Sequence, residues 1–236
     1  MSKDSNNQEI DKFFRPINNP EEWKQLLAKP DKHWKTGYSA KALAYCWYEV
    51  RDFPPEVKRA FDTSGIDIFQ NIKMLVAFPE YKVPLLGGRR ASQSDIFILA
   101  RAKDQLVSIM VEGKVSEPFG DTVAEWKSGS GRGRENRLRY LCDLLGLNTV
   151  VVDHIRYQLL HRTASAIIEA ERFNAPNALV LVHSFSSKNE WFEDYEKFLA
   201  LFGVMAEVDS LVFAKIIRGV KLYFGWVKGN KEYLSR

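Results

Sequence analysis

Two neighbouring segments of the chain have the alternation of apolar and polar positions that is typical of β-strands. Residues 94–102 and 105–114 are both rich in β-branched and apolar side chains, and only Lys103 and Asp104 lie between them. A polar connection of two residues predicts a tight hairpin turn. The turn also sets the register, because each residue of one strand then has a defined partner on the other.

This register gathers charged side chains at one end of the hairpin. Asp95 lies directly opposite Glu112, and the period of two places Lys114 on the same face as Glu112. That face continues with three apolar residues, Phe97, Leu99 and Met110. The opposite face is aliphatic throughout, with Ile96, Ile98, Val107, Ile109 and Val111. A hairpin that is apolar on both faces belongs inside a sheet, where charges are rare unless they are paired or bind metal. The three charges therefore predict a functional site.

The remaining pattern predicts further helices and strands around this hairpin. The first expected helix starts after Asn19 as N-cap, with Pro20 in its first turn, and leads into residues 23–28. Further expected helices cover residues 39–50, 55–61, 66–78, 137–145, 157–173 and 190–202. Expected strands cover residues 81–85, 178–185, 211–217 and 220–227, the last two joined at Arg218-Gly219. The fold class is therefore α/β, with a central mixed sheet flanked by helices. We expect a disordered tail over residues 1–12, a helical N-terminal layer over 13–65 and a core over 66–236, all in a single domain 13–236.

Composition is compatible with an ordinary cytoplasmic protein. The 236 residues are 45% hydrophobic, which is enough for one substantial core, and the net charge of +4 permits an acidic partner. No apolar run is long enough to span a membrane, and no signal peptide is recognisable. Cys46 and Cys142 lie in apolar helical patterns, and we interpret both as reduced core residues.

The charged end of the hairpin suits metal-assisted hydrolysis of a phosphodiester. Two facing carboxylates, Asp95 and Glu112, would repel each other unless a divalent cation lay between them, and oxygen ligands favour Mg²⁺ or Mn²⁺ over zinc. Gly113 could add its carbonyl oxygen, and Lys114 could orient water or stabilise developing charge. The alternative is that Glu112 and Lys114 form an exposed strand end and that Asp95 is an ordinary turn residue.

The arrangement of Ser94-Asp95 and Glu112-Gly113-Lys114 resembles the PD-(D/E)XK nuclease superfamily, although Ser94 stands where a proline is usual. The resemblance implies a restriction-endonuclease-like core in which a helix precedes a mixed sheet and a later helix crosses to a further strand. It also implies a further metal contact by a glutamate at the first helix, for which Glu80 is the candidate. Residues 34–40 and 157–164 resemble an uncharacterised bacterial family of the same superfamily, which brings no known substrate.

A Gly/Ser-rich stretch over residues 128–136 separates the hairpin from the next helix. Arg132, Arg134 and Arg137 make this region basic, and a mobile basic loop beside a phosphodiesterase site could embrace a nucleic-acid backbone. The alternative is a solvated loop.

Gln158, His161 and Arg162 share one face of the expected helix 157–173. The resemblance implies that this face meets the metal cleft, where these residues could contact phosphate or hold a carboxylate. The alternative is that His161 and Arg162 pair on the surface with Asp153 or Glu169.

The expected function is hydrolysis of nucleic acid by a Mg²⁺- or Mn²⁺-dependent phosphodiesterase, with DNA favoured over RNA. Asp95, Glu112 and Lys114 would be its catalytic residues. No membrane partner is expected, and a homodimer is left open. Two rivals remain: a non-catalytic module for nucleic-acid or protein binding on the same scaffold, and a purely structural charge cluster.

Overall fold

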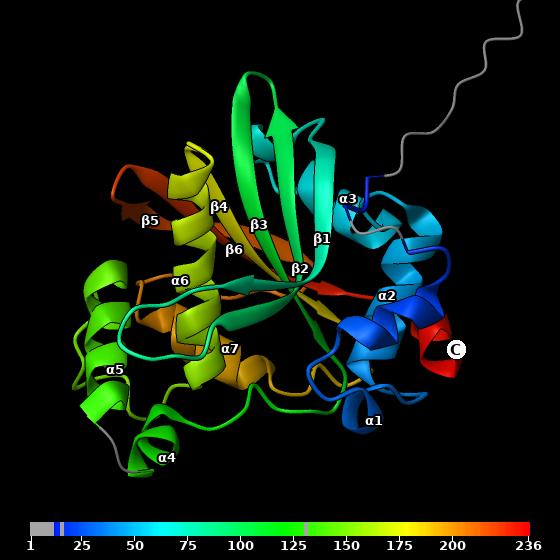
Figure 1. The fold of residues 1–236 in the computed structure, drawn as a ribbon. Helices are drawn as coiled ribbons and strands as arrows, with labels where there is room; N and C mark the ends of the chain where they lie inside the picture. Colours follow the sequence, from blue (N-terminus) through cyan, green and yellow to red (C-terminus); the bar gives the residue numbers. More distant parts are fainter. Residues whose placement is uncertain (1–11, 15–16, 130–131) are drawn as a thin grey trace, which may run out of the picture.

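A six-stranded sheet with the strand order β1-β2-β3-β4-β6-β5 separates two helical layers (Figure 1). The computed structural model describes residues 12–14, 17–129 and 132–236. The strands are β1 Lys73–Val83, β2 Ser92–Ala102, β3 Gln105–Lys114, β4 Asn177–Ser184, β5 Ser210–Ile217 and β6 Val220–Lys228. The pairs β1–β2, β2–β3 and β5–β6 are antiparallel, whereas β3–β4 and β4–β6 are parallel. The predicted α/β class with a mixed, helix-flanked sheet is confirmed.

The β2–β3 hairpin has the register that its two-residue turn predicts. Ala102 pairs with Gln105, and the ladder continues without a shift to Ile96 and Val111. Lys103 takes the left-handed conformation that such a turn needs, with φ of 52°. Asp95 and Glu112 follow directly after Ile96 and Val111, the last pair of the ladder, so the two strands carry these carboxylates where their pairing ends.

The two faces of the sheet have separate apolar cores. One face packs against α5 (Arg132–Leu145), α6 (Tyr157–Arg172) and α7 (Phe192–Ala200), with the short α4 (Val123–Ser128) beside them. The N-terminal layer covers the other face with η1 Pro20–Leu26, α1 Pro30–His33, α2 Ser39–Val50, α3 Pro55–Thr63 and η2 Asp67–Phe69, together with the C-terminal η3 Lys231–Ser235. The predicted crossover from hairpin to helix to parallel strand is formed by β3, α6 and β4.

The outer half of the β1–β2 hairpin turns away from the main sheet. In Figure 1 it runs across α6 toward α5. The bend coincides with Glu80, whose φ of 50° is left-handed. The pairs on either side, Pro79–Ile96 and Tyr81–Ser94, keep one register, which places Glu80 opposite Asp95. A left-handed residue within a strand changes the direction of the backbone locally. We call residues 81–94 beyond this bend the arm.

The prediction of a helix over residues 66–78 is wrong. The chain there forms the single turn η2 and then enters β1 at Lys73. The register of β1 shifts between Met74 and Val76, so the apolar spacing of this edge strand departs from a strict period of two. That irregular spacing resembles the helical period, which explains the error.

The loop expected over residues 128–136 is also only partly correct. Residues 130–131 lie outside the described part of the chain, but α5 already begins at Arg132. Leu138 and Leu141 of this helix are buried in the core. Tertiary packing of this kind outweighs the low helix propensity of a glycine in the first turn.

The N-terminal segment lies along the free edge of β1. Residues 1–11 of the expected tail lie outside the described residues, but Lys12 does not belong to a tail. Its carbonyl accepts a hydrogen bond from the Ala77 N–H at 2.8 Å, and the Phe14 N–H donates to the Ala77 carbonyl at 3.0 Å. Within the described ranges, no helix is long and apolar enough to cross a bilayer.

Candidate active site

Glu112 lies at the C-terminal end of β3 and is 4% exposed. Its Oε1 accepts a hydrogen bond from Lys114 Nζ at 2.7 Å, and its Oε2 accepts one from Arg162 Nε at 2.6 Å. Lys114 is equally buried, and its ammonium lies over the ring of Phe119 at 4.7 Å. The interpretation of Glu112 and Lys114 as an exposed strand end is therefore wrong. Burial opposes ionisation of Glu112, but the charges of Arg162 and Lys114 outweigh it and lower its pKa to about 2.

Asp95 lies beside Glu112 on the neighbouring strand and is half-buried. Its Oδ2 accepts a hydrogen bond from the backbone N–H of Gly113 at 2.7 Å. A side chain at position 113 would crowd this contact, because its Cβ would lie 3.2 Å from Leu43 Cδ2 and 3.4 Å from Asp95 Oδ2. Burial and the nearby charges of Glu112 and Glu80 raise the pKa of Asp95 well above its usual range.

Glu80 is the third carboxylate of this group, but it does not follow a helix as expected. It lies within β1, at the bend, and is 6% exposed. Gln93 Nε2 donates to its Oε2 at 2.7 Å, and Trp23 Nε1 donates to its Oε1 at 3.3 Å. Burial raises the pKa of Glu80 to about 7, against the effect of these two hydrogen bonds.

Helix α6 supplies the polar groups that face these strands. Gln158 Oε1 accepts from Lys114 Nζ at 3.2 Å, and Arg162 Nη1 donates to Ser92 Oγ at 3.1 Å. Arg162 is 7% exposed and bound to Glu112, so the alternative of a surface pair with Asp153 or Glu169 is wrong for it. Asp153 pairs with Lys127 instead, and Glu169 pairs with Arg172.

His161 lies beside Arg162 and is held as a neutral acceptor at Nδ1. This nitrogen is 2.8 Å from Ser92 Oγ and 3.4 Å from Arg162 Nη1. Because a guanidinium can only donate, Nδ1 carries no proton and the Nε2 of the ring does. Burial and the charge of Arg162 lower the pKa of His161 well below its usual range.

The three arginines expected to bind nucleic acid have different surroundings. Arg137 is 6% exposed, and its guanidinium donates to the carbonyls of Leu86, Arg90 and Leu85 at 2.6, 3.0 and 3.0 Å. It therefore holds the arm rather than presenting a free charge. Arg134 lies over the ring of Trp126 at 5.6 Å and donates to the Trp126 carbonyl. Arg132 begins α5, and its side chain lies outside the described part of the structure.

A pocket of about 460 Å³ opens between the arm, α4 and the N-terminal parts of α5 and α6. We call it the arm pocket. Its lining residues include Arg89, Arg90, Ser92, Trp126, Arg134, Tyr157 and His161. Sequence patterns did not indicate Arg89, Arg90 and Ser92 as site residues. These residues reach α6 only because the arm bends at Glu80, and no pattern in the sequence indicated that bend. The adjacent arginines in a Gly-containing turn were the one signal that could have indicated them.

Cys46, Glu56 and His183 form a second group with metal-ligand chemistry, on the opposite face of the sheet. Trp47 Nε1 donates to His183 Nδ1 at 3.0 Å, so the proton of the neutral ring is on Nε2, which donates to Glu56 Oε1 at 3.1 Å. A metal at Nε2 would require the other tautomer and would leave the Trp47 donor without an acceptor. This group is therefore a hydrogen-bond network that links α2 and α3 to β4.

The donor set at Asp95 suits a hard divalent cation better. Asp95, Glu112 and Glu80 come from three adjacent strands, and they offer only carboxylate oxygens, the ligands that Mg²⁺ and Mn²⁺ prefer. Lys114 and Arg162 both pair with Glu112. A cation held by Asp95 would favour its ionised form against burial and against the charges of Glu112 and Glu80, which together raise its pKa.

Residues 16–231 match the family DUF6946, a domain of unknown function, and the chain belongs to that family. No curated protein and no solved structure matches the chain. The family assigns no activity, so any function has to be argued from the chemistry of the site.

Proposed function

We propose that this DUF6946 protein is a Mg²⁺- or Mn²⁺-dependent phosphodiesterase that hydrolyses nucleic acid. The observation that carries the proposal is the convergence of Asp95, Glu112 and Glu80 from neighbouring strands, with Lys114 bonded to Glu112 at 2.7 Å. Carboxylates grouped in this way beside a buried amine are suited to metal-assisted attack on a phosphodiester.

Asp95 and Glu112 would hold the cation, and Glu80 and the carbonyl of Gly113 are the further candidate ligands. The Gly113 N–H positions Asp95, while Arg162 and Lys114 orient the two oxygens of Glu112. When bound, the cation polarises the phosphoryl oxygen and acidifies a water molecule. Lys114 would donate a hydrogen bond where negative charge develops, because its ammonium lies beside the ligand Glu112.

The resemblance to the PD-(D/E)XK superfamily adds support. It implies an aspartate on one strand, an acidic residue and a lysine on the next, and a helix that crosses to a further strand. Here Asp95 lies on β2, Glu112 and Lys114 lie on β3, and α6 crosses to β4, with Gln158 and Arg162 facing the site. The free, buried Cys46 and Cys142 suit a reducing compartment such as the cytoplasm.

The test begins with metal binding. We expect calorimetry to show that Mg²⁺ and Mn²⁺ bind the wild type and that Asp95→Asn and Glu112→Gln each remove this binding. Both changes preserve side-chain size while removing one charged oxygen ligand. Glu196→Gln, the same kind of exchange at an exposed residue of α7, serves as the matched control. Equal affinity in all four proteins would contradict the metal site.

Cleavage is then measured on single- and double-stranded DNA and RNA with each metal. We expect Lys114→Met to keep metal binding and lose cleavage, because methionine fills the space of the buried lysine but cannot stabilise charge. Activity that persists in this variant would point to another site. Metal binding without cleavage of any substrate would favour a non-catalytic binding module. If no metal binds, the cluster is structural, which would agree with the two cationic partners of Glu112.

A further inference from the structure

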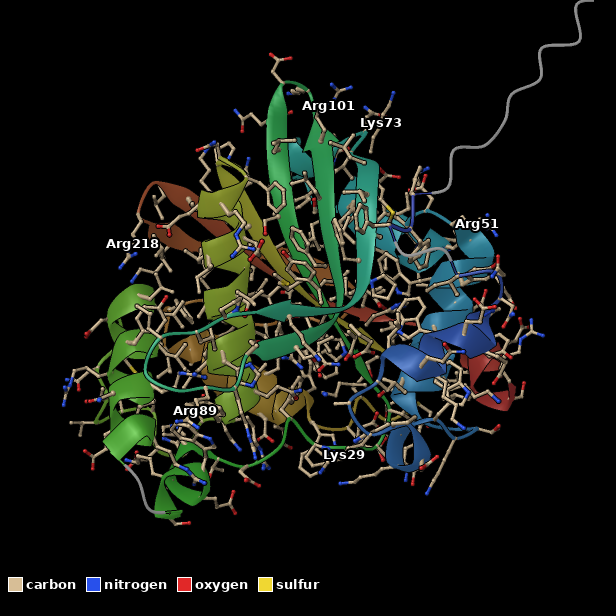
Figure 2. All side chains as sticks on the ribbon, in the orientation of Figure 1. Lys29, Arg51, Lys73, Arg89, Arg101 and Arg218 are labelled. Carbon is tan, nitrogen blue, oxygen red and sulfur yellow. The ribbon has the colours of Figure 1, made fainter. Side chains whose placement is uncertain are left out.

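The arm pocket indicates which class of substrate the proposed phosphodiesterase takes. This inference rests on the proposed function. The pocket lies between the arm, α4, α5 and α6, and Figure 2 shows the labelled Arg89 at this end of the molecule. Its volume of about 460 Å³ falls within the range of small-ligand sites. It is therefore large enough for one nucleotide.

One part of the pocket is strongly basic. Arg89 and Arg90 are exposed at the tip of the arm, and within the described ranges their side chains make no hydrogen bond or ion pair. Arg134 adds a third guanidinium, and no carboxylate lines the pocket among the described residues. The first turns of α5 and α6 also reach it, and helix N-termini favour anions. These groups together suit a phosphate.

The other part of the pocket is aromatic. The rings of Trp126 and Tyr157 are stacked, with their centroids 3.9 Å apart and an angle of 10° between their planes. Leu85 and Ala91 of the arm extend this apolar wall. A stacked aromatic pair beside a basic rim matches a ligand that has a planar ring system and an anionic group, and a nucleotide has both.

Two lining residues connect the pocket to the carboxylates. The Ser92 hydroxyl contacts His161 Nδ1 at 2.8 Å and accepts from Arg162 at 3.1 Å, and Arg162 holds Glu112 at 2.6 Å. The wall of the pocket is thus two hydrogen bonds from a proposed metal ligand. We infer that a strand with one nucleotide in the pocket continues toward this side of the sheet, where Arg162 holds Glu112.

We propose that the arm pocket binds a single nucleotide of an unpaired strand, with its phosphate on Arg89, Arg90 and Arg134 and its base against Trp126 and Tyr157. A base within a duplex is stacked and paired, so it cannot enter such a pocket unless it is first unpaired. The substrate class is therefore single-stranded nucleic acid, or an unpaired end.

The test measures binding in EDTA, which makes it independent of metal and cleavage. Calorimetry compares adenosine 5′-monophosphate with inorganic phosphate. We expect the nucleotide to bind about tenfold more tightly, because stacking of one base on aromatic side chains contributes a factor of this order. The double variant Arg89→Ala/Arg90→Ala should weaken both ligands, whereas Tyr157→Leu should weaken only the nucleotide and Tyr157→Phe should restore it.

Lys73→Ala/Arg101→Ala is the matched control, because it removes the same charge from exposed side chains at the opposite end of the β1–β2 hairpin (Figure 2). It should bind both ligands like the wild type. Equal affinity for phosphate and nucleotide, or unchanged binding in the Arg89/Arg90 variant, would overturn the proposal.

Strand preference is the second readout. In EDTA, anisotropy with labelled oligonucleotides of one length should show single strands binding about tenfold more tightly than the duplex, because the duplex must first unpair. Equal binding would overturn the assignment to unpaired strands. If the wild type bound the nucleotide but no metal, only the proposed function would be contradicted. If it bound metal but no nucleotide, only this inference would be contradicted.

Discussion

At the scale of single residues, the site depends on how Glu112 remains an anion while buried. Arg162 and Lys114 each bind one of its oxygens, and each of these cations is itself buried. Such an arrangement is costly to break, because removing one partner leaves an uncompensated charge in the interior.

Arg162→Met should therefore lower the free energy of unfolding by about 3–5 kcal/mol in urea denaturation, since Glu112 loses its partner on α6. Arg218→Met is the matched control, because Arg218 pairs with Glu171 of the same helix at the surface. This exposed pair is worth about 1 kcal/mol or less. The double variant Glu112→Gln/Arg162→Met should recover part of the loss. A single Arg162→Met variant as stable as the control would contradict the role of Arg162.

A second residue-scale prediction concerns the pH dependence of stability at Glu56. Burial opposes ionisation of Glu56, but the hydrogen bond that His183 donates prevails and lowers its pKa from the ordinary 4.5. A carboxylate with a lowered pKa stabilises the fold above its unfolded pKa, and this contribution disappears as the pH falls through the folded value.

Denaturation of the wild type and Glu56→Gln should therefore differ most at neutral pH and converge as the pH falls below 4.5 and through the lowered pKa of Glu56. Glu232→Gln, an exposed glutamate in η3, should follow the wild type throughout. A gap between wild type and Glu56→Gln that stays constant down to acid pH would show that the charge of Glu56 is not responsible.

The local part of the site was predictable and the long-range part was not. A two-residue turn fixed the register of Asp95 and Glu112, and the period of two placed Lys114 beside Glu112, where the structure has it. The ion pair between Glu112 and Arg162 spans 50 residues. Such a pair depends on how α6 crosses the sheet, and spacing along the chain contains no such information.

At the scale of elements, the arm is the feature that sequence patterns did not reveal. The irregular register of β1 and the left-handed conformation of Glu80 are consequences of tertiary packing. Because of the irregular register, the apolar spacing of β1 resembles that of a helix. The strands and helices with regular patterns, such as α2 and the β5–β6 hairpin, lie within a residue or two of their expected bounds. The arm is held to α5 chiefly through Arg137.

Arg137→Met should loosen the arm without unfolding the protein, because three backbone carbonyls of residues 85–90 lose their donor together. Hydrogen exchange followed by mass spectrometry should show faster exchange in peptides that cover the arm and little change in β3 and β4. Arg139→Met, an exposed arginine two positions further along the same helix, is the control. Equal exchange in the two variants would mean that other contacts hold the arm.

At the scale of the whole molecule, the two edges of the sheet differ. β1 forms one edge, and residues 12–14 lie along it through the two hydrogen bonds of Ala77. Edge strands with free N–H and C=O groups are templates for pairing with another chain. The short N-terminal segment therefore protects this edge.

A variant that begins at residue 17 should associate as its concentration rises, because the Ala77 N–H and C=O lose their partners. Sedimentation velocity would detect this as an increase in the weight-average sedimentation coefficient. A variant that begins at residue 12 keeps the edge covered and should behave like the full chain. Identical sedimentation of both variants would assign no protective role to residues 12–14.

The long separation in sequence between Glu112 and Arg162 has a consequence for the order of folding. The hairpin brings Asp95 and Glu112 together through a turn of two residues, whereas Arg162 must wait for the crossover to close over a far longer loop. Before α6 docks, burial of Glu112 as an anion would be strongly unfavourable. We therefore expect the charged end of the hairpin to stay hydrated until α6 arrives, so that hairpin and crossover consolidate as one cooperative unit.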